Sequence, residues 1–176
     1  MNYIGSKNIV DLFVKNKMKW LFFASTSHVY KSQFQKIREN SKLSPISYYG
    51  KTKLLSEKYI QKNKNKIIPC IGRIFSFTTE KQKTNYFIPS IIKKLKSKKK
   101  RIEINNVNHE RDFLTIDDII SAILFLKRKK AKGIFNICSG KKINLIKIID
   151  ALNLKFKKEI KINKNIIKTT LYGSNK

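Results

Sequence analysis

Glycine is scarce in this chain of 176 residues. The sequence contains six glycines, and no two of them stand three residues apart. A loop that cradles nucleotide phosphates needs closely spaced glycines, because the backbone N–H groups must approach the phosphates without side chains in the way. The sequence therefore contains no glycine-rich phosphate loop.

Cysteine and long apolar runs are also scarce. Cys70 and Cys138 lie in apolar segments without the spacing of metal ligands, so we expect reduced, buried thiols, no disulfide and no metal site. The longest apolar runs, "WLFFA" and "IISAILFL", are too short to cross a membrane. The chain does not open with a signal peptide. These features predict a cytoplasmic protein with no membrane partner.

Acidic residues are few, 11 against 40 basic ones, which gives a net charge of +29. Such an excess raises the alternative of a basic nucleic-acid-binding module. Only 5 of the basic residues are arginine, the side chain that favours bidentate phosphate and base recognition. Lysine, isoleucine and asparagine make up 79 residues, and all three have A/T-rich codons, so codon bias explains the charge without a ligand. We expect no specific nucleic-acid partner.

The chain alternates between helical periodicity and short β-branched or aromatic runs, the pattern of βαβ units and a parallel sheet. This predicts one α/β domain with a buried core. The predicted helices span residues 2–17, 48–63, 86–98, 116–130 and 144–154, and the predicted strands span 19–26, 66–75, 101–104 and 133–138.

A Tyr-x-x-x-Lys spacing occurs three times, and the pair Tyr49/Lys53 stands in the most suggestive context. Thr26 ends a predicted strand, where parallel sheets gather functional groups, and Tyr49 begins the next predicted helix with Lys53 one turn later. An ammonium at that distance lowers the pKa of a phenol, and a drop of about 3 units requires roughly 4 kcal/mol. Tyr49 then exchanges a proton with a sugar oxygen that Thr26 also hydrogen-bonds. The alternative is that Tyr49 packs on the core and Lys53 is solvated.

Four segments carry a resemblance to a known family. In order and spacing, "FFASTSHVY", "SPISYYGKTKLLSE", "RDFLTIDDIISAI" and "GIFNICSGKKINLIKII" resemble motifs of the extended short-chain dehydrogenase/reductases, the NAD-dependent epimerase/dehydratases of nucleotide sugars. The likeness runs from "NYIGS" at Asn2 to about residue 154. It implies the C-terminal part of a Rossmann-like, doubly wound parallel sheet with a small substrate-binding region. The family's glycine-rich turn would precede Met1, so we expect a fragment of a longer enzyme that is inactive alone.

The resemblance also implies roles for individual residues. The family's catalytic trio corresponds to Thr26, Tyr49 and Lys53. NAD or NADP would contact Asn2, Ser25, Tyr49 and Lys53, and the nucleotide sugar would contact Thr26, Ser76 and Arg111. The stretch around Ser76 departs from the family's pattern, because Ser76 replaces an asparagine and Thr79-Glu80 replaces Gly-Pro. Arg111 resembles the arginine that meets the substrate diphosphate, with an ion pair to a neighbouring carboxylate as its alternative.

The resemblance divides the chain into residues 1–75, a partial NAD(P)-binding and catalytic portion, and 76–176, a substrate-binding region interleaved with the last sheet elements. It implies a nucleotide-sugar 4-keto reductase or 4-epimerase. Dehydratases are disfavoured, because the dehydratases that this stretch resembles carry Thr-Asp-Glu where this sequence has "TSH". A non-catalytic interaction domain is the remaining alternative. The resemblance also implies a homodimer of the full-length protein through helices 2–17 and 48–63, with these apolar side chains available: Ile9, Val10, Phe13, Leu54, Leu55 and Tyr59.

Overall fold

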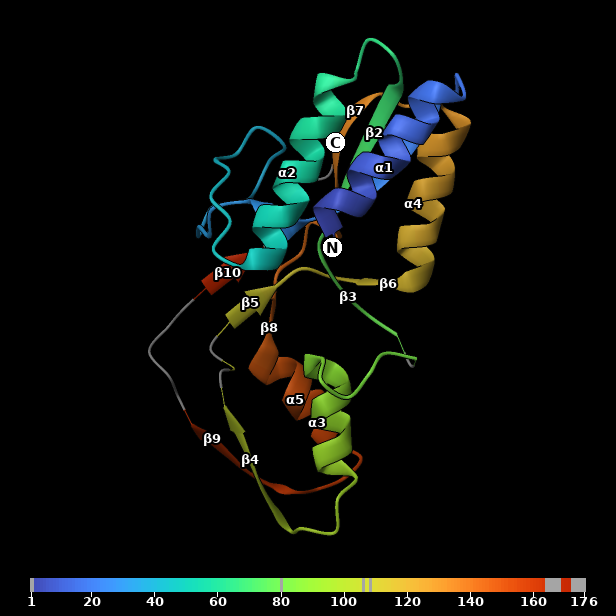
Figure 1. The fold of residues 1–176 in the computed structure, drawn as a ribbon. Helices are drawn as coiled ribbons and strands as arrows, with labels where there is room; N and C mark the ends of the chain where they lie inside the picture. Colours follow the sequence, from blue (N-terminus) through green and yellow to red (C-terminus); the bar gives the residue numbers. More distant parts are fainter. Residues whose placement is uncertain (1, 80, 106, 108, 164–168, 172–176) are drawn as a thin grey trace.

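A three-stranded parallel sheet with helices on both faces forms the upper part of the molecule (Figure 1). The computed structural model describes residues 2–79, 81–105, 107, 109–163 and 169–171. The strands β1 (Trp20–Thr26), β2 (Ile68–Ile74) and β7 (Gly133–Ile137) are ordered β1-β2-β7. This arrangement confirms the predicted α/β class.

Each face of this sheet has its own apolar core. The helices α1 (Asn2–Lys15) and α2 (Tyr48–Lys62) cover one face, and α4 (Ile116–Arg128) covers the other. Side chains alternate between the two faces along each strand. Ile71 of β2 therefore packs with Val10 and Ile60 from the first pair of helices, whereas its neighbour Cys70 packs with Ile119 and Leu126 from α4.

The pairing of β1 with β2 brings their carboxyl ends together. Thr26 is the partner of Ile74, and Ser25 is the partner of Arg73. Because both strands end at the same edge of a parallel sheet, the residues that follow them enclose a common space.

The lower part of the molecule has a separate core (Figure 1). The helices α3 (Phe87–Leu95) and α5 (Leu145–Asn153) pack there against β4 (Arg101–Asn105), which pairs in parallel with β9 (Glu159–Asn163). Short elements connect the two parts: η1 (Ser27–Val29), β3 (Ser76–Thr78), β5 (His109–Arg111), β6 (Phe113–Thr115), β8 (Ile143–Asn144) and β10 (Thr169–Leu171).

All nine elements predicted from the sequence are present, with ends that differ by three residues at most. The short strands of the connecting region were not predicted. Strands of two or three residues carry too few positions for an alternating pattern, and their pairing with distant segments decides their conformation. For example, β3 is a strand because Ser76 and Thr78 pair in parallel with Phe113 and Thr115 of β6.

Both cysteines are buried, as predicted, and neither takes part in a disulfide. Burial raises the pKa of Cys70 to about 11 and that of Cys138 to about 12, so both thiols are protonated at neutral pH. The described residues include no group of three or more metal-ligating side chains. Within the same residues, no helix combines the length and apolarity that a membrane crossing requires.

Candidate active site

A cavity of about 820 Å³ opens at the carboxyl ends of β1 and β2. Residues from the sheet, from the start of α2 and from the connecting strands line it. The cavity brings together six of the residues predicted to form the site: Ser25, Thr26, Tyr49, Lys53, Ser76 and Arg111. The seventh, Asn2, begins α1, and its side chain lies outside the described part of the structure.

Thr26 is held where β1 turns into the 3-10 helix η1. Its side-chain oxygen accepts a hydrogen bond from the backbone N–H of His28 at 3.3 Å, which caps η1. The hydroxyl group also lies near enough to the Tyr49 phenol to lower its pKa. The side chain is 6% exposed, so this contact lies in a largely dry environment.

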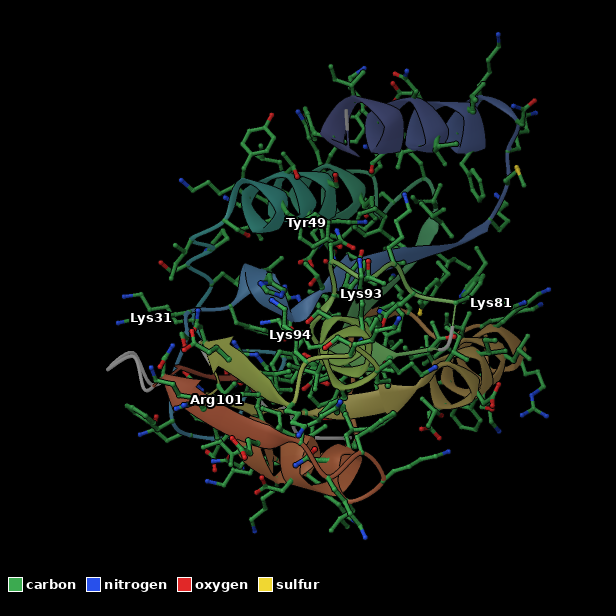
Figure 2. All side chains as sticks on the ribbon, turned by 90° about the horizontal axis from the view of Figure 1, so that it is seen from below. Lys31, Tyr49, Lys81, Lys93, Lys94 and Arg101 are labelled. Carbon is green, nitrogen blue, oxygen red and sulfur yellow. The ribbon has the colours of Figure 1, made fainter. Side chains whose placement is uncertain are left out.

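Tyr49 stands in the first turn of α2. Ser47 begins this helix by accepting a hydrogen bond from the backbone N–H of Gly50 at 3.0 Å. The Tyr49 ring packs edge-to-face on the ring of His28 with 6.3 Å between centroids. Tyr49 remains 45% exposed, so its phenol is accessible from the cavity. Figure 2 shows its position on α2.

Lys53 points from α2 to the end of β1. Its ammonium group donates a hydrogen bond to the carbonyl oxygen of Ala24 at 2.8 Å and lies 4.8 Å from the centre of the Phe23 ring. The same ammonium is 5.9 Å from the centre of the Tyr49 ring. The lysine is therefore directed toward the strand and the cavity, as the site hypothesis requires, and its charge lies near the phenol.

The pKa of Tyr49 differs from the sequence-based expectation. Burial raises the pKa of the phenol, and the Thr26 hydroxyl opposes that rise only in part. The predicted lowering by Lys53 is wrong for this arrangement, because the ammonium bonds to Ala24. Burial also lowers the pKa of Lys53, against the opposing charge of Glu57. Tyr49 is therefore a protonated phenol at neutral pH, suited to donate a proton.

Arg111 and Ser76 also line the cavity. The Arg111 guanidinium donates a hydrogen bond to the backbone oxygen of Glu110 at 3.0 Å, and burial lowers its pKa. Burial, with the charge of Arg111 as a second cause, lowers the pKa of His28, so the imidazole is neutral at pH 7. The basic side chains that line the cavity are Lys53 and Arg111.

The lysine excess is spread over the surface. The basic side chains that Figure 2 labels come from separate segments, namely Lys31 before α2, Lys81 before α3, Lys93 and Lys94 on α3, and Arg101 on β4.

Sequence reasoning missed three buried charged residues near the site. Glu57 of α2 and Arg73 of β2 form an ion pair with 2.6 Å between Nη2 and Oε2, and both are at most 3% exposed. Asp112 is fully buried and accepts hydrogen bonds from the backbone N–H groups of Ser139 and Gly140. Glu57 lies one turn after Lys53, and this i+4 spacing could have indicated it.

A glycine lets α2 approach the end of β1. A Cβ atom at Gly50 would overlap the backbone oxygen of His28 and lie 3.0 Å from Cβ of Pro45.

We expect Gly50→Ala to destabilise the fold by about 1–3 kcal/mol, because a backbone atom cannot yield as a side chain does. The matched control is Gly5→Ala in the first turn of α1, where a Cβ atom meets nothing within 4 Å. There alanine should stabilise the helix by about 1 kcal/mol or less. Urea unfolding of both variants measures the difference, and equal midpoints would contradict the close approach.

Comparison with known proteins gives a consistent picture. Residues 1–138 match the model of the NAD dependent epimerase/dehydratase family. The chain is 28% identical to the uncharacterized UDP-glucose epimerase YtcB of Bacillus subtilis, over 86% of this chain and 49% of that protein. It is 30% identical to GDP-6-deoxy-D-talose 4-dehydrogenase of Aggregatibacter actinomycetemcomitans, over 80% of this chain and 49% of that protein. The chain thus spans about half the length of these curated relatives.

A solved structure shares the fold. The structure of RMD from Pseudomonas aeruginosa complexed with NADPH matches with a TM-score of 0.89 at 22% identity, over 99% of this chain and 64% of that one.

Proposed function

The chain belongs to the NAD-dependent epimerase/dehydratase family, and from this premise we propose that it supplies the proton-transfer and sugar-binding residues of an NAD(P)-dependent enzyme acting on a nucleotide sugar. The observation that carries the proposal is that Thr26, Tyr49 and Lys53 all line a single cavity. Within this class we favour a 4-keto reductase, with a 4-epimerase as the alternative.

The donors in the cavity suit a nicotinamide cofactor. Lys53 and Tyr49 would hold the nicotinamide ribose through an ammonium and a hydroxyl group, and Asn2 and Ser25 are the further candidate contacts. The bound nicotinamide would supply or accept the hydride at the sugar carbon. NAD and NADP both remain candidates, because their difference lies at the adenosine ribose, away from these residues.

The chain's own residues move the proton. Tyr49 is protonated at neutral pH and donates its proton to the sugar keto oxygen as that oxygen gains negative charge. Thr26 donates a hydrogen bond to the same oxygen and keeps it near the phenol. The Lys53 ammonium, once drawn from Ala24 toward the phenol by a bound cofactor, would stabilise the phenolate that remains. A phenol poised as a proton donor is the observation that favours a reductase over an epimerase.

Two further residues that line the cavity, Arg111 and Ser76, suit the rest of the substrate. Arg111 presents a planar guanidinium of the kind that binds a diphosphate with two parallel hydrogen bonds. Ser76 can hydrogen-bond the sugar. These contacts would hold the substrate between the connecting strands and the sheet, and we propose the same division of the chain into a catalytic portion at 1–75 and a substrate-binding region at 76–176.

The test of this function is an assay with a nucleotide-activated 4-keto sugar. The enzyme assayed joins this chain to a glycine-rich dinucleotide-binding half taken from a relative. A reductase consumes one NADH or NADPH for each sugar reduced, whereas an epimerase interconverts 4-hydroxy sugars with no net change in cofactor absorbance at 340 nm. Neither reaction would occur if the cavity bound a different class of ligand.

A homodimer through α1 and α2 is the proposed assembly. Val10, predicted to contribute to the interface, is wholly buried in the chain's own core, whereas Ile9 and Leu55 are 50% and 49% exposed. We expect the double variant Ile9→Lys, Leu55→Lys to sediment as a monomer where the parent is a dimer. The matched control replaces Ile120 and Leu124 of α4, 48% and 51% exposed, and should remain dimeric. A parent protein that is monomeric at micromolar concentration would contradict the assembly.

A further inference from the structure

We propose that Glu57 is a positioning residue whose carboxylate ties α2 to the ends of β1 and β2 and thereby sets the placement of Tyr49 against Thr26. This inference rests on the proposed function for its catalytic meaning, but the geometry that carries it involves neither cofactor nor substrate.

Glu57 links its own helix, α2, to two strands. Its Oε1 atom accepts a hydrogen bond from the Ser25 hydroxyl of β1. Arg73 of β2 donates from Nη2 to Oε2 at 2.6 Å, and from Nε at 3.1 Å to Oε1 and 3.2 Å to Oε2. Ser25 and Arg73 are partners across the two strands, so one carboxylate from the helix spans the β1–β2 pair.

The position of Glu57 along the chain makes this contact relevant to the site. Tyr49, Lys53 and Glu57 are spaced by four residues and share one face of α2. Fixing Glu57 against the sheet fixes the rotation of that face. The anchor on β1 is Ser25, the residue directly before Thr26. The same carboxylate thus restrains both the helix that carries Tyr49 and the strand that carries Thr26.

Arg73 is in turn held on its other side. Its Nη1 atom donates to the backbone oxygen of Glu39 at 3.1 Å, and its guanidinium lies 4.7 Å from the centre of the Tyr30 ring. Removing two charges from water costs free energy that a buried ion pair recovers only in part, so an apolar pair of similar volume often matches its contribution to stability. A directional anchor next to the reacting groups is what an apolar pair cannot reproduce.

The test replaces the pair by Glu57→Met with Arg73→Met and follows the phenol of Tyr49 by NMR, with tyrosine labelled at ¹³Cζ. The double change removes one charge of each sign, so a shift in the Tyr49 pKa reports chiefly the placement of its phenol against the Thr26 hydroxyl, which lowers that pKa in the parent. We expect the pKa to rise as far as it does in Thr26→Val, with the melting temperature retained within a few degrees. A Tyr49 pKa equal to that of the parent in a folded double variant would overturn the proposal.

Two single variants complete the experiment. Ser25→Ala leaves the ion pair intact and removes only its link to β1. The Tyr49 pKa should therefore rise, but less than in the double variant. This single variant carries the test if the double variant does not fold. An unchanged pKa in Ser25→Ala would overturn the proposal equally. The matched control is Glu103→Gln, which breaks an exposed ion pair with Lys161 at 3.3 Å and should leave Tyr49 unchanged. Because the readout requires neither cofactor nor substrate, failure of the nucleotide-sugar assay would not decide whether Glu57 positions Tyr49.

Discussion

Replacing Tyr49 by phenylalanine is expected to lower turnover roughly 100-fold or more, in an enzyme that joins this chain to a glycine-rich dinucleotide-binding half. The reason is the loss of the one positioned proton donor, since general acid catalysis of this kind contributes about 10²–10⁴-fold. The ring is retained, so packing on His28 and the cavity shape should persist. Steady-state kinetics on the 4-keto sugar should therefore show the loss in kcat, with KM changing little.

The neighbouring tyrosine provides a matched control for this experiment. Tyr48 precedes Tyr49 at the start of the same helix, but it is 79% exposed and does not line the cavity. Tyr48→Phe should therefore keep the parent's turnover. If Tyr49→Phe retained more than about a tenth of the parent's kcat, Tyr49 would not be the proton donor.

The pH dependence follows from the direction of the Tyr49 pKa. Reduction needs the protonated phenol, and burial raises the pKa of Tyr49 above its ordinary value of 10.0. The rate of the proton-transfer step should therefore be constant through neutral pH and fall only in the alkaline range, as pH rises through the raised pKa. A bound cofactor that brings the Lys53 ammonium closer to the phenol would move this limb to lower pH.

The regular elements and the gathering of the site could be predicted from the sequence. The helix at 48–62 has an N-cap serine, and the strand at 20–26 is a continuous apolar run ending in hydroxyl residues. Together these local signals place Thr26, Tyr49 and Lys53 within reach of one another, because parallel strands end at a common edge. Local pattern was sufficient because each of these elements is long enough to show its period.

The electrostatics of the site could not be predicted in the same way. The direction of the Tyr49 pKa depends on where the Lys53 ammonium points, and spacing on a helix does not reveal that it bonds to the oxygen of Ala24. The ion pair of Glu57 with Arg73 joins residues 16 apart in sequence and depends on how α2 packs on the sheet. Its further link to Ser25 depends on the register of β1 against β2, which is a property of the folded sheet. Such contacts follow from tertiary packing, which a one-dimensional pattern does not contain.

The 176-residue chain by itself is expected to show no micromolar affinity for NADH or NADPH in titration calorimetry. Lys53 and Tyr49 can hold one ribose of the cofactor, but the sequence contains no glycine-rich turn at a helix N-terminus to bind the negatively charged pyrophosphate. Proton transfer without a held nicotinamide gives no turnover, since the hydride must come within contact of the sugar carbon.

The same titration separates two ways in which the site can be completed. Joining the chain to a glycine-rich dinucleotide-binding half, or mixing the two polypeptides, should bring the affinity into the micromolar range, and Lys53→Met in the completed protein should weaken it again. The outer edge of β1 is where such a half would pair, because this strand has β2 as its only partner among the described residues and carries no charged side chain. Micromolar binding by the 176-residue chain alone would show instead that the cavity at the ends of β1 and β2 holds the cofactor without a phosphate loop.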